Sequence, residues 1–91
     1  MINEQFLAEI HETILSYGFI HAPNNFNKYC YYDKGWSTET GGAETSILVD
    51  ENEEYFDIIY VGEEMGFMRV LCSLEGKDIT LESINKEIRK L

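Results

Sequence analysis

The stretch from Gly35 to Met68 limits the possible folds more than any other part of the sequence. Nine of its residues are acidic and none is Lys or Arg. It also holds the segments SILV and YFDIIYV, which are rich in the β-branched and aromatic residues typical of strands, joined by the acidic run DENEE. The acids are therefore predicted to lie on a sheet and its turns, and not in a disordered acidic tail.

Size and composition indicate one folded domain that spans residues 1–91. Hydrophobic residues make up 44% of the chain and aromatic residues 13%, which suits a packed core. No apolar run approaches the roughly 18 residues that a membrane-spanning helix needs. The N-terminal sequence MINEQFLAEI has neither a basic region nor an apolar run typical of a signal peptide. We therefore expect a soluble, cytoplasmic protein.

Two helices are predicted, one near each end of the chain. Apolar residues at helical spacing predict a helix over residues 3–17, capped by Asn3 and ended by Gly18. A second helix is predicted to begin after Thr80, with an apolar stripe formed by Leu81, Ile84, Ile88 and Leu91.

Between the helices the pattern changes to strands. Short connections leave no room for crossover helices, so the strands are expected to be mostly antiparallel, as a meander. The predicted strands cover residues 26–32, 36–40, 45–50, 55–61 and 67–74. Residues 36–40 are expected to form a hairpin with 26–32. The predicted fold is an α+β two-layer sandwich with a four- to five-stranded sheet.

Alternation along the strands predicts which residues face the core. One row, expected on the core side, contains Phe56, Ile58, Tyr60, Met68, Val70, Cys72 and Leu74. The opposite row contains Tyr55, Asp57, Ile59, Val61, Phe67, Arg69, Leu71 and Ser73. If both helices cover the first face, the second is open to solvent although it is apolar and aromatic in part.

The cysteines and histidines give no sign of a chemical site. Cys30 and Cys72 are expected to be buried and reduced and to behave as small hydrophobic residues. A disulfide between them is possible only if their strands are neighbours. His11 is predicted at a helix edge and His21 in a loop, each without visible partners. The run from Asp50 begins like a calcium loop but has Tyr55 where glycine is required, so a solvated turn is expected. No metal or cofactor is predicted.

Charge limits the classes of partner. The formal net charge is −10, which disfavours direct binding to nucleic acid or to anionic membranes and favours a basic protein surface. The sequence contains no nucleophile-elbow, phosphate-loop or dinucleotide-binding pattern. A non-enzymatic protein is therefore expected, and a small enzyme with an unrecognised site is the weaker alternative.

The leading hypothesis is an inhibitor that occupies a basic, nucleic-acid-binding surface of a partner such as a nuclease. Immunity proteins and DNA-mimicking phage inhibitors of defence nucleases are small acidic domains that act in this way. The analogy is physical and rests on charge alone, because the sequence contains no motif of either family. The alternative is an assembly subunit, such as a homodimer, whose acids only keep it soluble. The predicted contact residues are Tyr29, Tyr31, Trp36, Glu39, Glu44, Asp50, Glu51, Glu53, Glu54, Tyr55, Asp57, Glu63, Glu64 and Phe67.

Overall fold

Helix α1 (Glu4–Ser16) is the first element of the computed structural model, which describes residues 2–25, 27–33, 44–61 and 68–91. The side chain of Asn3 caps the helix by accepting a hydrogen bond from the backbone N–H of Phe6 at 2.8 Å. The chain leaves the helix through Gly18, whose φ of 90° lies in the left-handed region that glycine adopts without strain. The predicted helix over residues 3–17 is confirmed.

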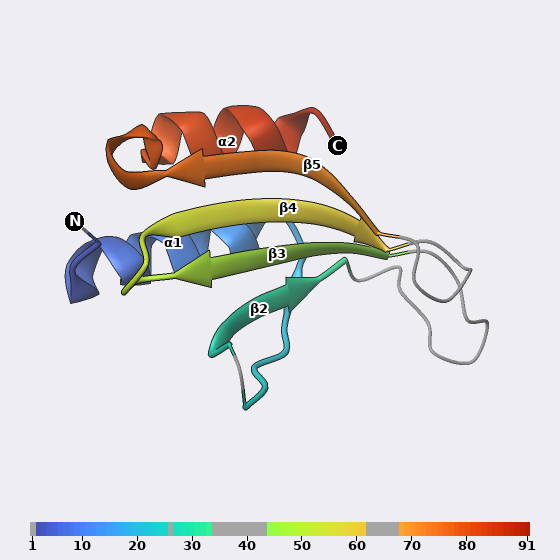
Figure 1. The fold of residues 1–91 in the computed structure, drawn as a ribbon, viewed down its shortest axis with the longest axis horizontal. Helices are drawn as coiled ribbons and strands as arrows, with labels where there is room; N and C mark the ends of the chain where they lie inside the picture. The colour runs from blue at the N-terminus through green and yellow to red at the C-terminus, as the bar shows by residue number, and fades with distance from the viewer. Residues whose placement is uncertain (1, 26, 34–43, 62–67) are drawn as a thin grey trace.

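A five-stranded antiparallel sheet follows, in the order β1-β2-β3-β4-β5. Its strands are β1 (Ile20–His21), β2 (Tyr29–Tyr32), β3 (Glu44–Asp50), β4 (Tyr55–Val61) and β5 (Met68–Glu75). Each strand pairs with the next one in the chain, so the sheet is a meander (Figure 1). The short turn η1 (Gly76–Asp78) then leads to helix α2 (Leu81–Arg89). The α+β fold predicted from the sequence is confirmed.

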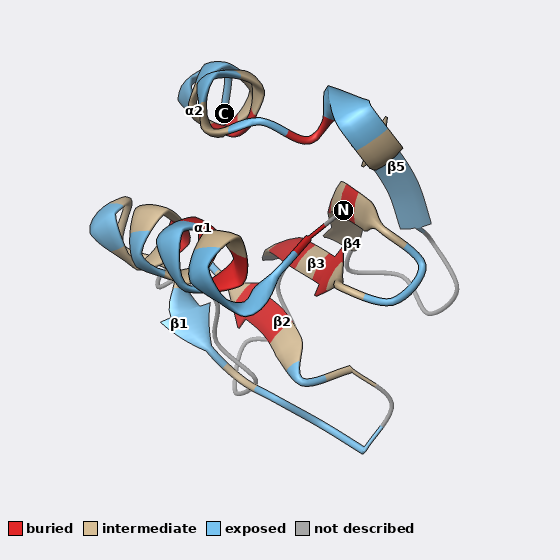
Figure 2. Cartoon of the chain, turned by 90° about the vertical axis from the view of Figure 1, so that its left-hand side faces the viewer, coloured by how far each residue is buried: buried red, intermediate tan, exposed pale blue. Residues whose placement is uncertain are grey.

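Both helices lie on the same side of the sheet (Figure 2). The apolar stripe of α1 buries Leu7, Ile10 and Ile14, and α2 buries Ile84 and Ile88. From the sheet, the core receives Tyr31, Ile47, Val49, Phe56 and Ile58. The hydroxyl of Tyr17 donates to Asn85 Oδ1 at 2.5 Å and so links the two helices. No helix of the described residues lies over the other face of the sheet.

The short strand β1 was not predicted. Its residue His21, expected in a loop, pairs with Tyr31 of β2. Strand β2 therefore has β1 on one side and β3 on the other. The predicted hairpin partner, residues 36–40, lies outside the described residues.

A β-bulge changes the expected orientation of part of β5. Ile58 pairs with Cys72, but Ile59 pairs with Val70, so one residue of β5 is extra at this point. The extra residue reverses the alternation beyond it. Met68 and Val70, predicted to face the core, lie on the uncovered face and are 63% and 55% exposed. Arg69, predicted on the uncovered face, pairs with Tyr60 and takes the opposite side.

The two cysteines lie on strands that are not neighbours. Cys30 is on β2 and Cys72 is on β5, with β3 and β4 between them. Both are free thiols, and Cys30 is buried. Burial is the main reason that the pKa of the Cys72 thiol is raised, with Glu87 raising it further. The expectation that these residues act as small hydrophobic side chains agrees with this placement.

Candidate functional site: the acidic end and the open face of the sheet

The loop between β3 and β4 holds several carboxylates in a fixed turn. Asp50 Oδ1 accepts hydrogen bonds from the backbone N–H groups of Asn52 and Glu53, each at 2.8 Å. This arrangement is an Asx turn, which uses a side-chain oxygen in place of a backbone acceptor. Glu54 completes the loop with a φ of 56°, a left-handed conformation that is uncommon for residues other than glycine.

The turn after β5 reaches the same end of the sheet. Because β4 and β5 are antiparallel, Tyr55 at the start of β4 pairs with Glu75 at the end of β5. The backbone N–H of Gly76 donates to the carbonyl of Glu54 at 2.9 Å and holds the two turns together. Between them lies a shallow hollow lined by Glu53, Glu54, Tyr55, Glu75, Gly76, Lys77 and Asp78.

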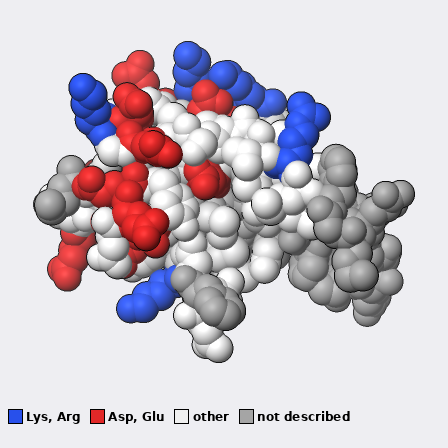
Figure 3. All heavy atoms as spheres, in the orientation of Figure 1, with Lys and Arg blue, Asp and Glu red and all other residues white. Residues whose placement is uncertain are grey.

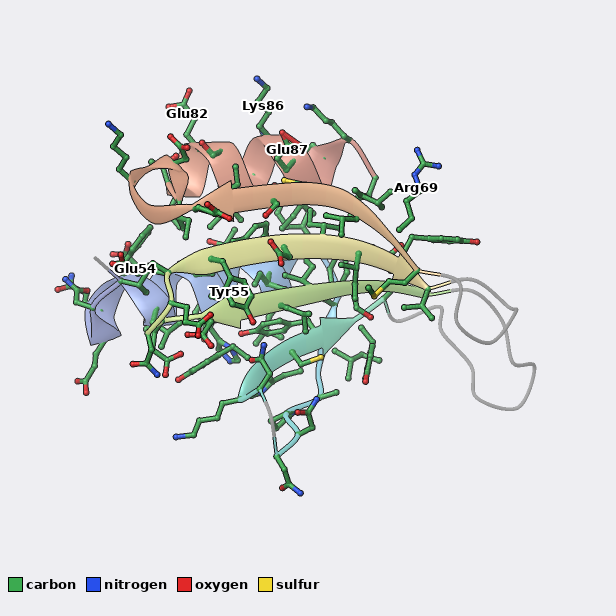
Figure 4. All side chains as sticks on the ribbon, in the orientation of Figure 1. Glu54, Tyr55, Arg69, Glu82, Lys86 and Glu87 are labelled. Atoms are coloured by element: carbon green, nitrogen blue, oxygen red, sulfur yellow. The ribbon has the colours of Figure 1, made fainter. Side chains whose placement is uncertain are left out.

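We call this region the acidic end; its acidic residues are Asp50, Glu51, Glu53, Glu54, Glu75 and Asp78. Acidic side chains gather on the left of Figure 3, where β3 and β4 are joined. Figure 4 places Glu54 at this end and Arg69 at the opposite end of the sheet. The charges of the described residues are thus unevenly distributed along the strands.

The pKa of the Tyr55 phenol responds to the negative charges at the acidic end. Partial burial is the main reason that its pKa is raised. The carboxylates of Asp50, Asp57 and Glu53 raise the pKa further, because a negative field disfavours a phenolate. The acidic groups therefore act together on one side chain that lies among them.

Next to the acidic end, the sheet face without helices is largely apolar. We call it the open face and define it by Tyr32, Leu48, Tyr55, Asp57, Ile59, Val61, Met68, Val70 and Ser73; Cys30 and Ser46 belong to the same side but are buried. Within this set, Asp57 accepts a hydrogen bond from the Ser73 hydroxyl at 2.7 Å. The open face and the acidic end are continuous through Tyr55, which belongs to β4 and lines the acidic hollow.

The structure brings together part of the predicted contact set. Asp50, Glu51, Glu53 and Glu54 share the acidic end, and Tyr55 and Asp57 extend it along β4. Glu44 begins β3, at the other end of that strand from Asp50. The remaining predicted residues Trp36, Glu39, Glu63, Glu64 and Phe67 lie outside the described residues.

Two predicted contact residues lie elsewhere. Tyr31 is only 1% exposed and forms part of the core, so it has almost no surface to offer a partner. Burial raises the pKa of its phenol well above the usual range, with smaller contributions from Tyr29 and Cys30. Tyr29 is paired with Val49 and lies beside a hollow on the helix side of the sheet. Neither residue belongs to the open face.

Sequence reasoning missed a cluster formed by His11, His21, Tyr29 and Tyr31. The His11 and His21 rings meet edge to face, with centroids 4.8 Å apart. His11 Nδ1 lies 2.7 Å from the Tyr31 hydroxyl oxygen. No spacing rule relates these residues, since His11 belongs to a helix and the others to a strand pair. Among the described residues, no group of three His, Cys, Asp or Glu side chains is arranged to hold a metal ion.

No family model, curated protein or solved structure matches the chain. No helix in the described part of the chain is long and apolar enough to cross a membrane.

Proposed function

We propose that this protein binds a partner protein and occupies a basic surface of it, of the kind that proteins use to hold nucleic acid. One observation carries the proposal: two separate turns place their carboxylates at one end of the sheet, next to an apolar face that no helix in the described part of the chain covers. A basic groove that neutralises phosphates also accepts a rigid array of carboxylates. The protein would then act as an inhibitor by occlusion.

The two parts of the surface would contribute differently to binding. Carboxylates at the acidic end speed the encounter with a basic surface and select against acidic partners. Apolar side chains of the open face, such as Ile59 and Val70, lose contact with water in the complex and supply most of the affinity. Tyr55 joins the two parts, and tyrosine is enriched among the residues that dominate binding energy.

Affinity capture from host lysate, with elution by a salt gradient, tests the proposal. We expect a basic nuclease or another nucleic-acid-binding protein, released as the salt concentration rises. Once the partner is known, the double variant Glu51→Lys/Glu53→Lys should weaken binding at least about tenfold through lost attraction and new repulsion. Binding that is indifferent to both salt and charge reversal would exclude the acidic end as the contact.

A matched control separates local from overall charge. The change Glu9→Lys/Glu82→Lys alters the net charge by the same amount, but at exposed positions of α1 and α2, which cover the opposite side of the sheet from the open face. We expect this control to weaken binding far less than the variant at the acidic end. Equal losses in the two variants would mean that only net charge matters.

A second candidate function is self-assembly through the open face, which the exposed side chains of Met68 and Val70 favour. It predicts a mass above that of the monomer in sedimentation equilibrium. Ile59→Lys should then return the protein to a monomer. A monomeric parent protein at all accessible concentrations would contradict this candidate.

A further inference from the structure

A second hollow lies between α1 and the β1–β2 edge of the sheet, apart from the acidic end. It is lined by Glu4, Leu7, Ala8, His11, Glu12, His21 and Tyr29. Two of these side chains are carboxylates and none is Lys or Arg. The hollow therefore combines negative charge with aromatic and aliphatic walls, and the proposed function does not use it.

Three rings form its aromatic part at different orientations. His21 and Tyr29 are nearly parallel, with an angle of 19° between their planes and centroids 6.2 Å apart. His11 stands almost perpendicular to both, at 82° to His21 and 80° to Tyr29. A roughly spherical ligand group that lies among two parallel rings and one perpendicular ring can contact the face of one ring and the edges of others at the same time.

Hydrogen bonds fix two of these rings before any ligand binds. His21 Nε2 lies 2.7 Å from the carbonyl oxygen of Lys28, which can only accept, so this nitrogen donates. Nδ1 of the neutral His21 ring is then left as an acceptor. His11 is held by the 2.7 Å contact of its Nδ1 with the buried hydroxyl of Tyr31. Preorganised rings reduce the entropy lost when a ligand binds.

We propose that this hollow binds an alkylated ammonium cation. Such a cation is attracted by the negative ring face of Tyr29 and by the carboxylates of Glu4 and Glu12. Its methyl groups, which are weakly hydrated, pack on Leu7 and Ala8. The same two carboxylates disfavour a compact anion.

Titration of the whole protein with choline, followed by NMR signals of the His11 and His21 rings, tests the site. The matched ligand is 3,3-dimethylbutan-1-ol, which has the shape of choline without its charge. We expect choline to shift both ring signals at millimolar concentration and to bind at least about fivefold more tightly than the alcohol. Equal binding of the two ligands, or no shift with choline up to about 50 mM, would overturn the proposal.

A pair of variants locates the binding. Glu12→Gln removes a carboxylate from the hollow, whereas Glu9→Gln removes one from an exposed position on the same helix. We expect the first to weaken choline binding about threefold and the second to leave it unchanged. Equal effects of the two variants would contradict the site.

An alkylated ammonium group can belong to a free small molecule or to a methylated lysine side chain of a protein. A further titration distinguishes these two sources. A short peptide that contains trimethyllysine presents the cation as a protein side chain, whereas choline presents it as a free molecule. Tighter binding of the peptide would assign the site to a modified partner, and exclusion of the peptide would assign it to small amines. Because no partner is needed, the result is independent of the function proposed for the acidic end.

Discussion

On β4, Ile58 and Ile59 are neighbours in the chain and lie on opposite faces of the sheet. Ile58 is fully buried under the helices, with no exposed surface, whereas Ile59 on the open face is only half-buried. Identical side chains therefore have different roles, and the difference comes from what covers each face. On the covered face apolar residues stabilise the fold; on the open face they remain available to a partner.

Alanine substitution at these two positions should separate the roles. Ile58→Ala creates a cavity in the packed core and should lower the free energy of unfolding by about 2–5 kcal/mol. Ile59→Ala should lower it by less than about 1.5 kcal/mol, since that side chain already contacts water. Urea denaturation measures both values.

A small domain has little stability to lose, so Ile58→Ala can fail to fold. Ile58→Val removes one methylene and should lower the free energy of unfolding by about 0.5–1.5 kcal/mol in a folded protein. Equal losses for matched changes at Ile58 and Ile59 would contradict the assignment of the two faces.

The dependence of stability on alkaline pH tests whether the Tyr31 phenol is buried on the covered face. Burial holds the folded-state pKa of its phenol above the unfolded value of about 10. The unfolded state therefore loses its proton first, and the stability that the neutral phenol contributes is fully present below about pH 10. Above that pH the free energy of unfolding should fall by up to about 1.4 kcal/mol per pH unit.

The variant Tyr31→Phe cannot ionise, so its stability should depend less steeply on pH above about 10. It also loses the contact with His11 Nδ1, which lowers its stability by about 1 kcal/mol at all these pH values. Parallel slopes for the variant and the parent protein in urea denaturation would contradict the burial of this phenol.

Much of the fold could be predicted because it depends on local patterns. Helical spacing with Asn3 and Gly18 at the ends specifies α1, and strict alternation specifies the burial of Phe56 and Ile58. The orientation of Met68 and Val70 could not be predicted in this way. Both rows of β5 contain apolar residues, so the hydrophobic pattern does not reveal where a bulge shifts the pairing.

The candidate sites depend on long-range pairing. The acids of the β3–β4 loop were predicted to act together because they are consecutive in the chain. The contribution of Glu75 required the pairing of β4 with β5, which places it opposite Tyr55. The hollow that contains His11 and His21 required both the two-residue strand β1 and its position beside α1, and a strand that short has no measurable periodicity.

A glycine at position 54 tests whether the acidic end is arranged for stability or for binding. Glu54 has a φ of 56°, which glycine adopts without strain, so Glu54→Gly should raise the free energy of unfolding by up to about 1 kcal/mol. Glu53→Gly is the control, since Glu53 does not have a positive φ and should gain nothing. Thermal unfolding measures both changes.

The same variant also bears on the proposed function. If the carboxylate of Glu54 contacts a partner, Glu54→Gly should bind the partner more weakly although it is the more stable protein. Unchanged binding would remove Glu54 from the contact surface. A loss of stability would mean that interactions of the Glu54 side chain stabilise the fold by more free energy than its left-handed backbone conformation costs.

The smallest expected effect concerns Tyr55, the counterpart of Tyr31 on the open face. Nearby carboxylates add to the effect of burial on the pKa of Tyr55, so removing one of them should lower it. Asp50→Asn is suited to this test, because an asparagine Oδ1 can still accept from Asn52 and Glu53 while the charge is lost.

NMR titration of the Tyr55 ring measures that pKa directly. We expect it to fall in Asp50→Asn and to fall in the parent protein as salt is added, whereas Glu9→Gln on the helix side should leave it unchanged. The pKa should stay above the ordinary value in every case, since burial is unaltered. A Tyr55 pKa that responds to neither change would show that the acidic end produces no field at the open face. Binding there would then rest on its apolar side chains alone.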